Sequence, residues 1–247
     1  MTKMGKIAHR PFISGCWISL AFLMASAHAA DAPFAMDKHT LLLCHFDADG
    51  CKADYAASGN TGTLASNALP EVVPADRKKF GKCIMMGRKS ILGYEINGGN
   101  FSNDVGTVEL WINLNGPIAG EKEITYLFVN ERYNTERFFL RFVKKAGSSV
   151  VLEYGILEGQ LYNIVAEVSA WKIGEWHHVA ASWGPGGMRL HIDEKLAGTN
   201  AYAGGLSRSD TSMLVGCYKA PGFGCDAKID EFRVSDIQRY LASKSNK

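Results

Sequence analysis

Apolar and polar residues alternate along much of the chain with the period of two that is typical of half-buried β-strands. Residues 107–114 show the pattern best, because Val108, Leu110, Ile112 and Leu114 share one side of an extended segment. Other short segments with this alternation, or with a brief apolar run, are 41–46, 84–86, 91–94, 138–142, 150–156 and 229–234. Each of them predicts a strand.

Two further strands are predicted at 176–183 and 188–193, on either side of the turn sequence Gly-Pro-Gly-Gly at 184–187. Glycine adopts positive φ without a steric penalty, so this turn predicts a β-hairpin. Apolar spacing of three and four residues does not persist over a helix-length window, and the one helix-like candidate is 235–240. Many short strands separated by glycine turns predict an all-β sandwich or barrel.

The N-terminus has the layout of a secretory signal peptide. Three Lys or Arg residues are followed by a mostly apolar run from 12 to 27 and by Ala27-His28-Ala29, small residues at the positions that a signal peptidase reads. We therefore predict that residues 1–30 are removed, with cleavage near Ala29 or Ala30. The mature protein is then secreted, either to a periplasm or to the extracellular space.

Two alternatives apply to the same region. The sequence Ile-Ser-Gly-Cys ending at Cys16 resembles a lipid-attachment motif, but the apolar run mostly follows that cysteine, whereas a lipoprotein signal has it before. A membrane span is disfavoured because the run is shorter than the ~20 apolar residues that a bilayer requires. The prediction is a chain with no membrane span.

The remaining chain fits one domain at 31–242, followed by a polar tail at 243–247. Three of the 27 basic residues lie in the predicted signal peptide, so 24 remain against 25 acidic residues and the formal net charge is −1. A nearly neutral chain has no electrostatic reason to bind nucleic acid.

Five cysteines remain after cleavage, and in an oxidising compartment they are expected to pair with one left over. Cys217 and Cys225 enclose a short glycine-containing loop and are the first candidate pair. The spacing leaves the pairing of Cys44, Cys51 and Cys83 open. No Cys/His spacing typical of a zinc site is present.

The order of the segments carries a family resemblance. The segments are FD at 46–47, DYAASGNTGTL at 54–64, FGKCI at 80–84, GTVELWI at 106–112, WHHVA at 176–180, LHIDEKLAG at 190–198 and KIDEFRVS at 228–235. Taken together over roughly residues 40–240, they resemble the laminin-G-like jelly-roll domains of the concanavalin A-like lectin/glucanase superfamily. The resemblance implies a two-sheet antiparallel jelly-roll β-sandwich.

Catalysis has weak support in the sequence. A retaining glycosidase needs two carboxyl groups ~5–5.5 Å apart, but the strand around Glu109 carries one carboxylate. Asp230 and Glu231 are adjacent and point to opposite faces of a strand, and Glu121 and Glu123 lie at a loop boundary. We predict that the protein is not an enzyme and has no catalytic residue. A glycan-cleaving hydrolase on the same fold, with an unrecognised site, is the alternative.

Histidines and aspartates are the candidate metal ligands of the chain. His177 and His178 are adjacent and face opposite ways on a strand, so they do not share an ion, although His191 lies on the partner strand. No cofactor is required, but the resemblance implies a structural Ca²⁺. Asp230 on the last strand corresponds to the family's ligand position, and Asp47 or Asp49 supplies further oxygens.

Sugar binding needs an exposed aromatic platform with polar neighbours. The aromatic residues in polar, glycine-containing segments are Tyr133, Trp171, Tyr202 and Tyr218, whereas Trp111, Trp176 and Trp183 are expected to pack inside. No pair of them is singled out, so the carbohydrate-binding residues stay unknown. We predict a non-catalytic recognition module for an extracellular glycan, with a protein-contacting adhesion or structural domain as the other alternative.

Overall fold

The computed structural model describes residues 32–48, 50–64, 68–76, 80–117, 123–132, 135–207, 211–219 and 222–240. The predicted signal peptide and the polar tail lie outside these residues, so their assignment stays a prediction. Among the described residues, no helix has the length and apolar character needed to cross a membrane.

Fifteen strands and one short 3-10 helix, η2 at Ala146–Ser148, make up the described part of the chain. The strands are β1 Thr40–Cys44, β2 Tyr55–Ala56, β3 Glu71–Pro74, β4 Lys82–Met86, β5 Gly93–Glu95, β6 Gly106–Leu114, β7 Ile124–Arg132, β8 Thr135–Lys144, β9 Val150–Glu158, β10 Gln160–Glu167, β11 Trp176–Trp183, β12 Met188–Ile192, β13 Lys195–Asn200, β14 Ser212–Val215 and β15 Ala227–Ser235.

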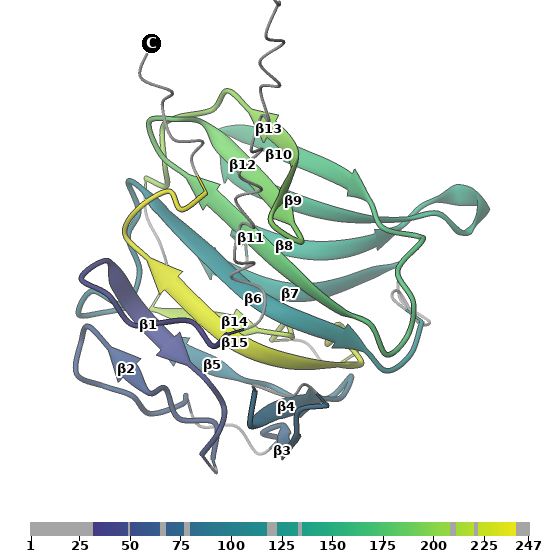
Figure 1. Cartoon of the computed structure of the whole chain (residues 1–247). Coiled ribbons are helices and arrows are strands. Elements are labelled where there is room, and N and C mark those ends of the chain that lie inside the picture. The colour runs from purple at the N-terminus through teal and green to yellow at the C-terminus, as the bar shows by residue number, and fades with distance from the viewer. Residues whose placement is uncertain are drawn as a thin grey trace, which may run out of the picture.

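These strands form two packed antiparallel sheets, one in front of the other in Figure 1. Sheet A has nine strands, with the order β13-β12-β11-β6-β15-β1-β2, and in addition β4 pairs with β15 and β3 pairs with β4. Sheet B has six strands in the order β10-β9-β8-β7-β14-β5. The predicted all-β class and two-sheet antiparallel jelly-roll β-sandwich are confirmed.

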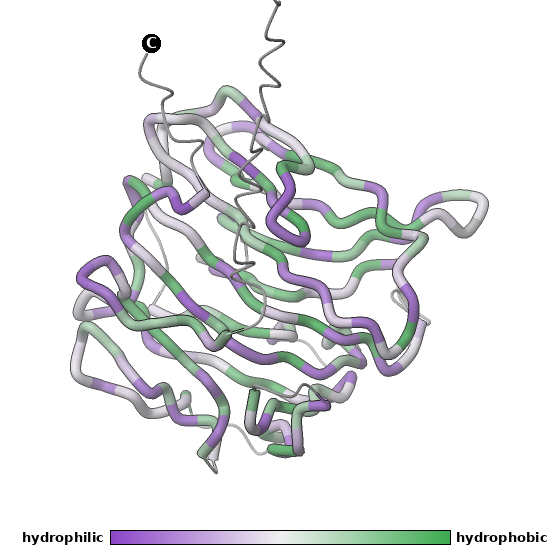
Figure 2. Tube along the Cα trace, viewed as in Figure 1, coloured by the Kyte–Doolittle hydropathy of each residue, from purple (hydrophilic) through white to green (hydrophobic). Residues whose placement is uncertain are grey.

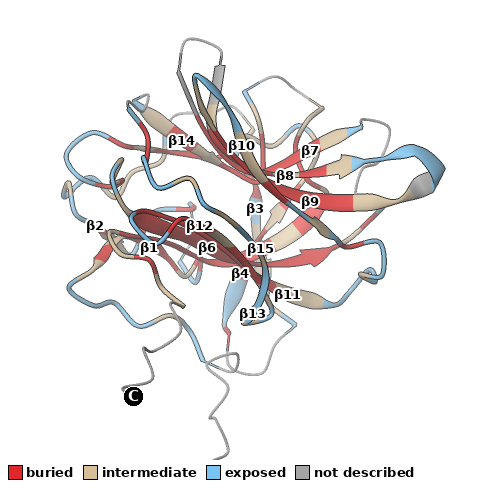
Figure 3. Cartoon of the chain, turned by 90° about the horizontal axis from the view of Figure 1, so that it is seen from above, coloured by how far each residue is buried: buried red, intermediate tan, exposed pale blue. Residues whose placement is uncertain are grey.

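The core lies between the sheets, where both present the apolar side of each strand. Buried residues run through the middle of both sheets in Figure 3, and the alternation of hydropathy along the strands is visible in Figure 2. Aromatic rings join the two layers: Trp183 of sheet A lies 4.9 Å from Phe138 of sheet B, and Phe101 stacks on Trp183 at 5.1 Å. Burial of such large rings is the main stabilising contribution to a sandwich of this kind.

The hairpin predicted around the Gly-Pro-Gly-Gly turn is present as β11 and β12. Val179 pairs with Ile192, and Ser182 pairs with Arg189. Gly187 has φ of 80° and donates its N–H to the carbonyl of Gly184 at 2.9 Å. A residue with a side chain rarely adopts this φ, which explains why glycine occupies position 187.

The helix-like candidate at 235–240 does not form a helix. Ser235 is the last residue of β15, and the chain then turns through residues 236–240. The backbone there bonds to the sheet and not to itself: Thr107 donates its hydroxyl to the carbonyl of Ile237 at 2.7 Å, and Arg239 N–H donates to the Thr107 hydroxyl at 2.9 Å. These tertiary hydrogen bonds outweigh the weak local preference for a helical turn.

A β-bulge in β15 decides which of its side chains leave the core. The register with β6 shifts between Asp230 and Arg233, and Glu231 has a positive φ of 53°. An extra residue at this point turns Phe232 into the core and Arg233 outward, opposite Glu109 of β6.

Glu109 is fully buried on the outer side of sheet A and is held by an ion-pair cluster. Arg233 donates through Nε to Oε1 at 2.8 Å, the Nε2 atom of His178 lies 3.2 Å from Oε2, and Tyr240 donates its hydroxyl to Oε2. Burial alone raises the pKa of Glu109, but the hydrogen bond from His178 and the charge of Arg233 lower it to about 2. Arg233 also donates to the carbonyl of Ala35 at 3.1 Å, so the cluster fixes the N-terminal segment to the sheet.

We expect Glu109→Gln to destabilise the protein by about 3–5 kcal/mol, because it leaves the buried Arg233 guanidinium without its carboxylate. Glu175→Gln removes an exposed ion pair with Lys172 and serves as the control, with a loss below about 1 kcal/mol. Urea unfolding at pH 7 measures both. Equal stabilities of the two variants would contradict the assigned role.

The pH dependence follows from the same ion pair. The pKa of Glu109 is lower in the folded state than its ordinary value of 4.5, so its contribution is complete above pH 4.5 and is lost as the pH falls toward 2. The stability difference between wild type and Glu109→Gln should therefore shrink in that range. Unfolding curves recorded from pH 7 down to pH 3 check this expectation.

Candidate functional site

The outer face of sheet B carries a row of polar and aromatic side chains on the side of the sheet that faces away from the core. The register pairs Tyr126 of β7 with Arg141 of β8, and Arg141 with Glu153 of β9. In the neighbouring row, Phe139 of β8 pairs with Gly155 of β9. Apolar residues of the same strands, such as Phe138, Leu140, Tyr154 and Ile156, face the core.

Phe139 lies flat along the sheet because its cross-strand neighbour is a glycine. A Cβ atom at Gly155 would lie 2.2 Å from Cζ of Phe139, so the ring occupies the place of the missing side chain. The guanidinium of Arg141 covers the ring, with its Cζ atom 4.0 Å from the ring centroid. This contact restricts the guanidinium to a position over the ring.

Glu153 fixes the arginine from the other side. Its Oε2 atom accepts a hydrogen bond from Nε of Arg141 at 2.9 Å, and its Oε1 atom accepts one from Nδ2 of Asn163 on β10 at 2.8 Å. Arg141 also lies 3.3 Å through Nη1 from the hydroxyl of Tyr126. We call the residues Tyr126, Phe139, Arg141, Glu153 and Asn163 the sheet B site.

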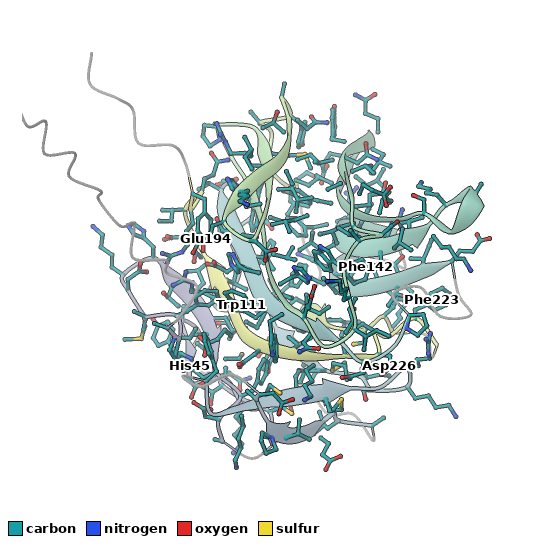
Figure 4. All side chains as sticks on the ribbon, turned by 45° about the vertical axis from the view of Figure 1, so that its right-hand side comes forward. His45, Trp111, Phe142, Glu194, Phe223 and Asp226 are labelled. Carbon is teal, nitrogen blue, oxygen red and sulfur yellow. The ribbon has the colours of Figure 1, made fainter. Side chains whose placement is uncertain are left out.

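Two aromatic rings from the segment after β14 extend the site beyond β7. Tyr218 stacks on Tyr126 with 4.9 Å between ring centroids, and Phe223 meets the edge of Tyr218 at 6.0 Å. The carbonyl of Phe223 accepts the N–H of Tyr126 at 3.0 Å, which ties this segment to the sheet. Phe223 is labelled in Figure 4. Phe142, which is labelled in the same view, packs in the core and is not part of the site.

The opposite end of the site is apolar and open to solvent. Leu161 and Val165 lie on either side of Asn163 along β10 and are 45% and 49% exposed. The site therefore combines fixed hydrogen-bonding groups with apolar surface on both sides.

A second, smaller feature lies at the ends of the strands. A pocket of about 280 Å³ is lined by Leu114, Gly116, Pro117, Val150, Ser169, Trp171 and Ile173. Trp171 is stacked on the imidazole of His177 at 4.0 Å, and Nδ1 of His177 lies 2.9 Å from a carboxylate oxygen of Asp193. One face of the indole is thus occupied by the protein itself.

A family profile described as the concanavalin A-like lectin/glucanases superfamily matches residues 93–241. The chain belongs to this superfamily. The predicted laminin-G-like resemblance is therefore confirmed, and the matched residues contain every member of the sheet B site. No curated protein matches the sequence.

Solved structures share the superfamily fold at low sequence identity. Domain 4 of an extracellular arabinanase from Geobacillus stearothermophilus, in complex with arabinotriose, superposes with a TM-score of 0.53 at 20% identity, over 80% of this chain and 92% of that one. The receptor-binding domain of botulinum neurotoxin mosaic serotype C/D gives 0.62 at 12% identity, over 83% of this chain and 48% of that one. Trypanosoma rangeli sialidase gives 0.58 at 14% identity, over 82% and 31%. The chain thus spans about half of the toxin domain and about a third of the sialidase.

The aromatic residues expected in loops have different surroundings. Trp171 lines the pocket described above, and Tyr218 belongs to the aromatic end of the sheet B site. Tyr202 is stacked on Tyr162 at 3.9 Å and donates its hydroxyl to the carbonyl of Gly205 at 2.8 Å. Tyr133 lies outside the described residues.

Of the three tryptophans expected inside, only Trp183 is in the core. Trp111 is buried on the opposite side of β6, between Phe80 and His178, because it alternates with the inward-facing Leu110 and Ile112. Trp176 is half-buried. Trp111 is thus buried as expected, but on the outer side of sheet A, because sequence alone does not distinguish burial on a covered outer face from burial between the sheets.

The adjacent histidines point in opposite directions, as expected. His177 pairs with Asp193, and His178 pairs with Glu109. His191 is 5% exposed, and burial lowers its pKa from the usual value. In the described residues, no group of three or more His, Cys, Asp or Glu side chains is arranged to hold a metal ion.

The two calcium candidates have structural roles in the sandwich. Asp47 accepts the N–H of Lys82 through Oδ1 at 2.7 Å, next to Gly81, where a Cβ atom would lie 2.3 Å from the same oxygen. Asp230 is fully buried, and its Oδ1 accepts the N–H of Glu231 at 2.9 Å. Asp49 lies outside the described residues. The calcium site stays a prediction.

The cysteines Cys44, Cys51, Cys83, Cys217 and Cys225 are all buried free thiols in the structure. No disulfide joins Cys217 and Cys225 in the described residues, so their pairing stays a prediction. Cys217 Sγ contacts the backbone of Leu92, with its N–H at 3.4 Å and its carbonyl at 3.5 Å. Burial raises the pKa of Cys217 to about 11, so the thiol stays protonated at neutral pH.

Sequence reasoning missed Arg141, Glu153 and Asn163. The first two lie at the polar positions between the inward-facing residues of two predicted strands, which places them on an outer face. Their contact depends on strand register, and β10, which carries Asn163, was not among the predicted strands.

We expect Gly155→Ala to destabilise the protein by about 1–3 kcal/mol, because its methyl group would collide with Phe139. Gly87→Ala is the control, since its Cβ atom would meet only the Ser90 hydroxyl at 3.6 Å and should change stability by less than about 0.5 kcal/mol. Urea unfolding of both variants makes the comparison. An unchanged Gly155→Ala variant would contradict the packing described for Phe139.

Proposed function

We propose that the protein is a secreted, non-catalytic carbohydrate-binding module that uses the sheet B site. The supporting observation is the arrangement of Arg141, whose guanidinium lies over the Phe139 ring and is fixed by Glu153. Sugar recognition depends on planar polar groups held in place beside aromatic surface, because a preorganised site loses little entropy on binding.

Each part of the site has a role in the proposal. The guanidinium of Arg141 and the amide of Asn163 donate hydrogen bonds to ring hydroxyls, and the carboxylate of Glu153 accepts them. Tyr218 and Phe223 are half-buried and offer ring surface at one end, whereas Leu161 and Val165 offer aliphatic surface at the other. The length of the site across four strands suits an oligosaccharide.

The arabinanase domain, which shares the fold and whose structure holds arabinotriose, supports a carbohydrate ligand in this superfamily. The toxin structure is named as a receptor-binding domain. An extracellular protein or glycan receptor is therefore also a candidate partner for this chain.

The hydrogen bonds and burial of Glu153 and Glu109 support the non-catalytic role. Glu153 is hydrogen-bonded through both oxygens, and Glu109 is buried in an ion cluster on the other sheet. Glycoside hydrolysis needs a second carboxyl group across the scissile bond at ~5–9.5 Å. The glycan-cleaving alternative is tested by incubating the protein with each oligosaccharide that it binds and looking for shorter products.

We expect the purified protein to bind oligosaccharides on a glycan array, and we expect Arg141→Met and Asn163→Ala to weaken that binding by about tenfold or more. This loss corresponds to about 1.4 kcal/mol, within the range for hydrogen bonds that involve a charged group. Lys172→Met, at an exposed lysine away from the site, is the matched control. Calorimetric titration with the best array ligand and with arabinotriose gives the affinities.

The absence of binding to every glycan on the array would contradict the proposal and favour the alternative of a protein-contacting domain. Binding that is equal in wild type and in both variants would place the ligand elsewhere, with the Trp171 pocket as the next candidate. Repeating the array with a chelator tests the calcium prediction: loss of binding would support it, and unchanged binding would remove calcium from the recognition step.

A further inference from the structure

Three buried polar atoms on neighbouring strands of sheet A have no hydrogen-bond partner among the described residues. They are Oγ of Ser182 on β11 and Nε of Arg189 and Nδ1 of His191 on β12. Ser182 is 1% exposed and His191 is 5% exposed, so bulk water has little access to hydrogen-bond with these groups. A buried polar atom that stays unpaired destabilises the fold, so three such atoms in one place require an explanation.

The strand register brings the three side chains together. Ser182 pairs directly with Arg189, and Ala180 pairs directly with His191. All four lie on the outer face of sheet A, because the residues that alternate with them belong to the core. Directly paired side chains have Cβ atoms ~4.5–5.5 Å apart, so the three polar groups occupy neighbouring positions around the small side chain of Ala180.

Positive charge dominates this cluster. None of the carboxylates in the described residues forms an ion pair with Arg189. The nearest acidic side chain across from Ala180 is Glu109, which is already held by Arg233, His178 and Tyr240. Arg189 is half-buried, so the cluster reaches solvent at that side chain.

The surroundings of His191 are also cationic or neutral. Tyr240 lies 5.5 Å away ring to ring, and burial, followed by the charges of Arg189 and His178, lowers the pKa of His191. The imidazole is therefore neutral at pH 7, and its Nδ1 atom donates in one of its two tautomers.

We propose that Ser182, Arg189 and His191 bind a tetrahedral oxyanion, sulfate or phosphate, either as the free ion or as an ester on a sugar. A hydroxyl, a guanidinium N–H and an imidazole N–H arranged around a small alanine match three oxygens of one tetrahedral group. The single unpaired guanidinium supplies the charge that an oxyanion needs, and binding satisfies all three orphaned atoms at once.

The test uses calorimetric titration of the purified protein with sodium sulfate and with sodium phosphate, at an ionic strength held constant with sodium chloride. We expect saturable binding of one ion per chain. Arg189→Gln should weaken it about tenfold or more, and Ser182→Ala by about threefold or more, as for hydrogen bonds to a charged group. Lys195→Gln removes a positive charge from the neighbouring strand β13 and should bind like wild type.

Two further measurements separate a binding role from a structural one and the free ion from the ester. Without oxyanion, Arg189→Gln should unfold at the same or a higher temperature than wild type, because it removes an unsatisfied buried group. Glucose 6-sulfate that binds more tightly than sulfate, with glucose inactive, would identify the sulfated sugar as the ligand. Equal affinity would identify the free ion.

The proposal is overturned if neither ion nor ester binds saturably, or if Arg189→Gln and Ser182→Ala bind like wild type. It does not depend on the sheet B site, because the two sets of residues lie on opposite sheets. If no neutral glycan binds on the array, the oxyanion proposal is unaffected. If sulfate does not bind, the proposal of carbohydrate binding at the sheet B site is unaffected.

Discussion

The pairing of β8 with β9 is the constraint on which the outer face of sheet B depends. One register places Phe139 opposite Gly155 and Arg141 opposite Glu153. The glycine gives the ring room to lie flat, the ring supports the guanidinium, and the carboxylate fixes the guanidinium in that position. A shift of β8 by one residue would turn Phe139 and Arg141 into the core and Phe138 and Leu140 out of it, and the burial of Phe138 and Leu140 prevents this.

The two sheets use their outer faces differently. On sheet A, the segments at both ends of the described chain are fastened to the strands by the Glu109 cluster, and Arg239 binds Asp37 through two hydrogen bonds of 2.8 and 2.9 Å. Several histidines take part in this fastening, including His45, whose pKa is raised by its hydrogen bond with Glu231. Sheet B has no comparable charge cluster in its described part, and its polar groups are fixed by one another.

Much of the fold could be predicted because it depends on local alternation. Val108, Leu110 and Ile112 had to share a face, and the glycine turn at 184–187 had to reverse the chain. The bulge at Glu231 was not predictable, since only the competition between core burial of Phe232 and ion pairing of Arg233 fixes it. The helix expected at 235–240 failed for a similar reason, because Thr107 takes up the backbone groups of that segment.

The sites were much less accessible to sequence reasoning. Arg141 and Glu153 are separated by a hairpin, and Asn163 joins them from a third strand. Ser182, Arg189 and His191 lie within one predicted hairpin, but their lack of partners is a property of the whole fold. In each case the sequence shows the residue types, but the contacts between them depend on the strand register and on the rest of the fold.

The most direct test of the account is an amide NMR titration of the protein with the oligosaccharide that binds it best. The account predicts that the largest shift changes fall on β8, β9 and β10 around residues 139–141, 153–155 and 163, while the amides of sheet A change little. Shift changes centred on sheet A or on the pocket beside Trp171 would contradict it.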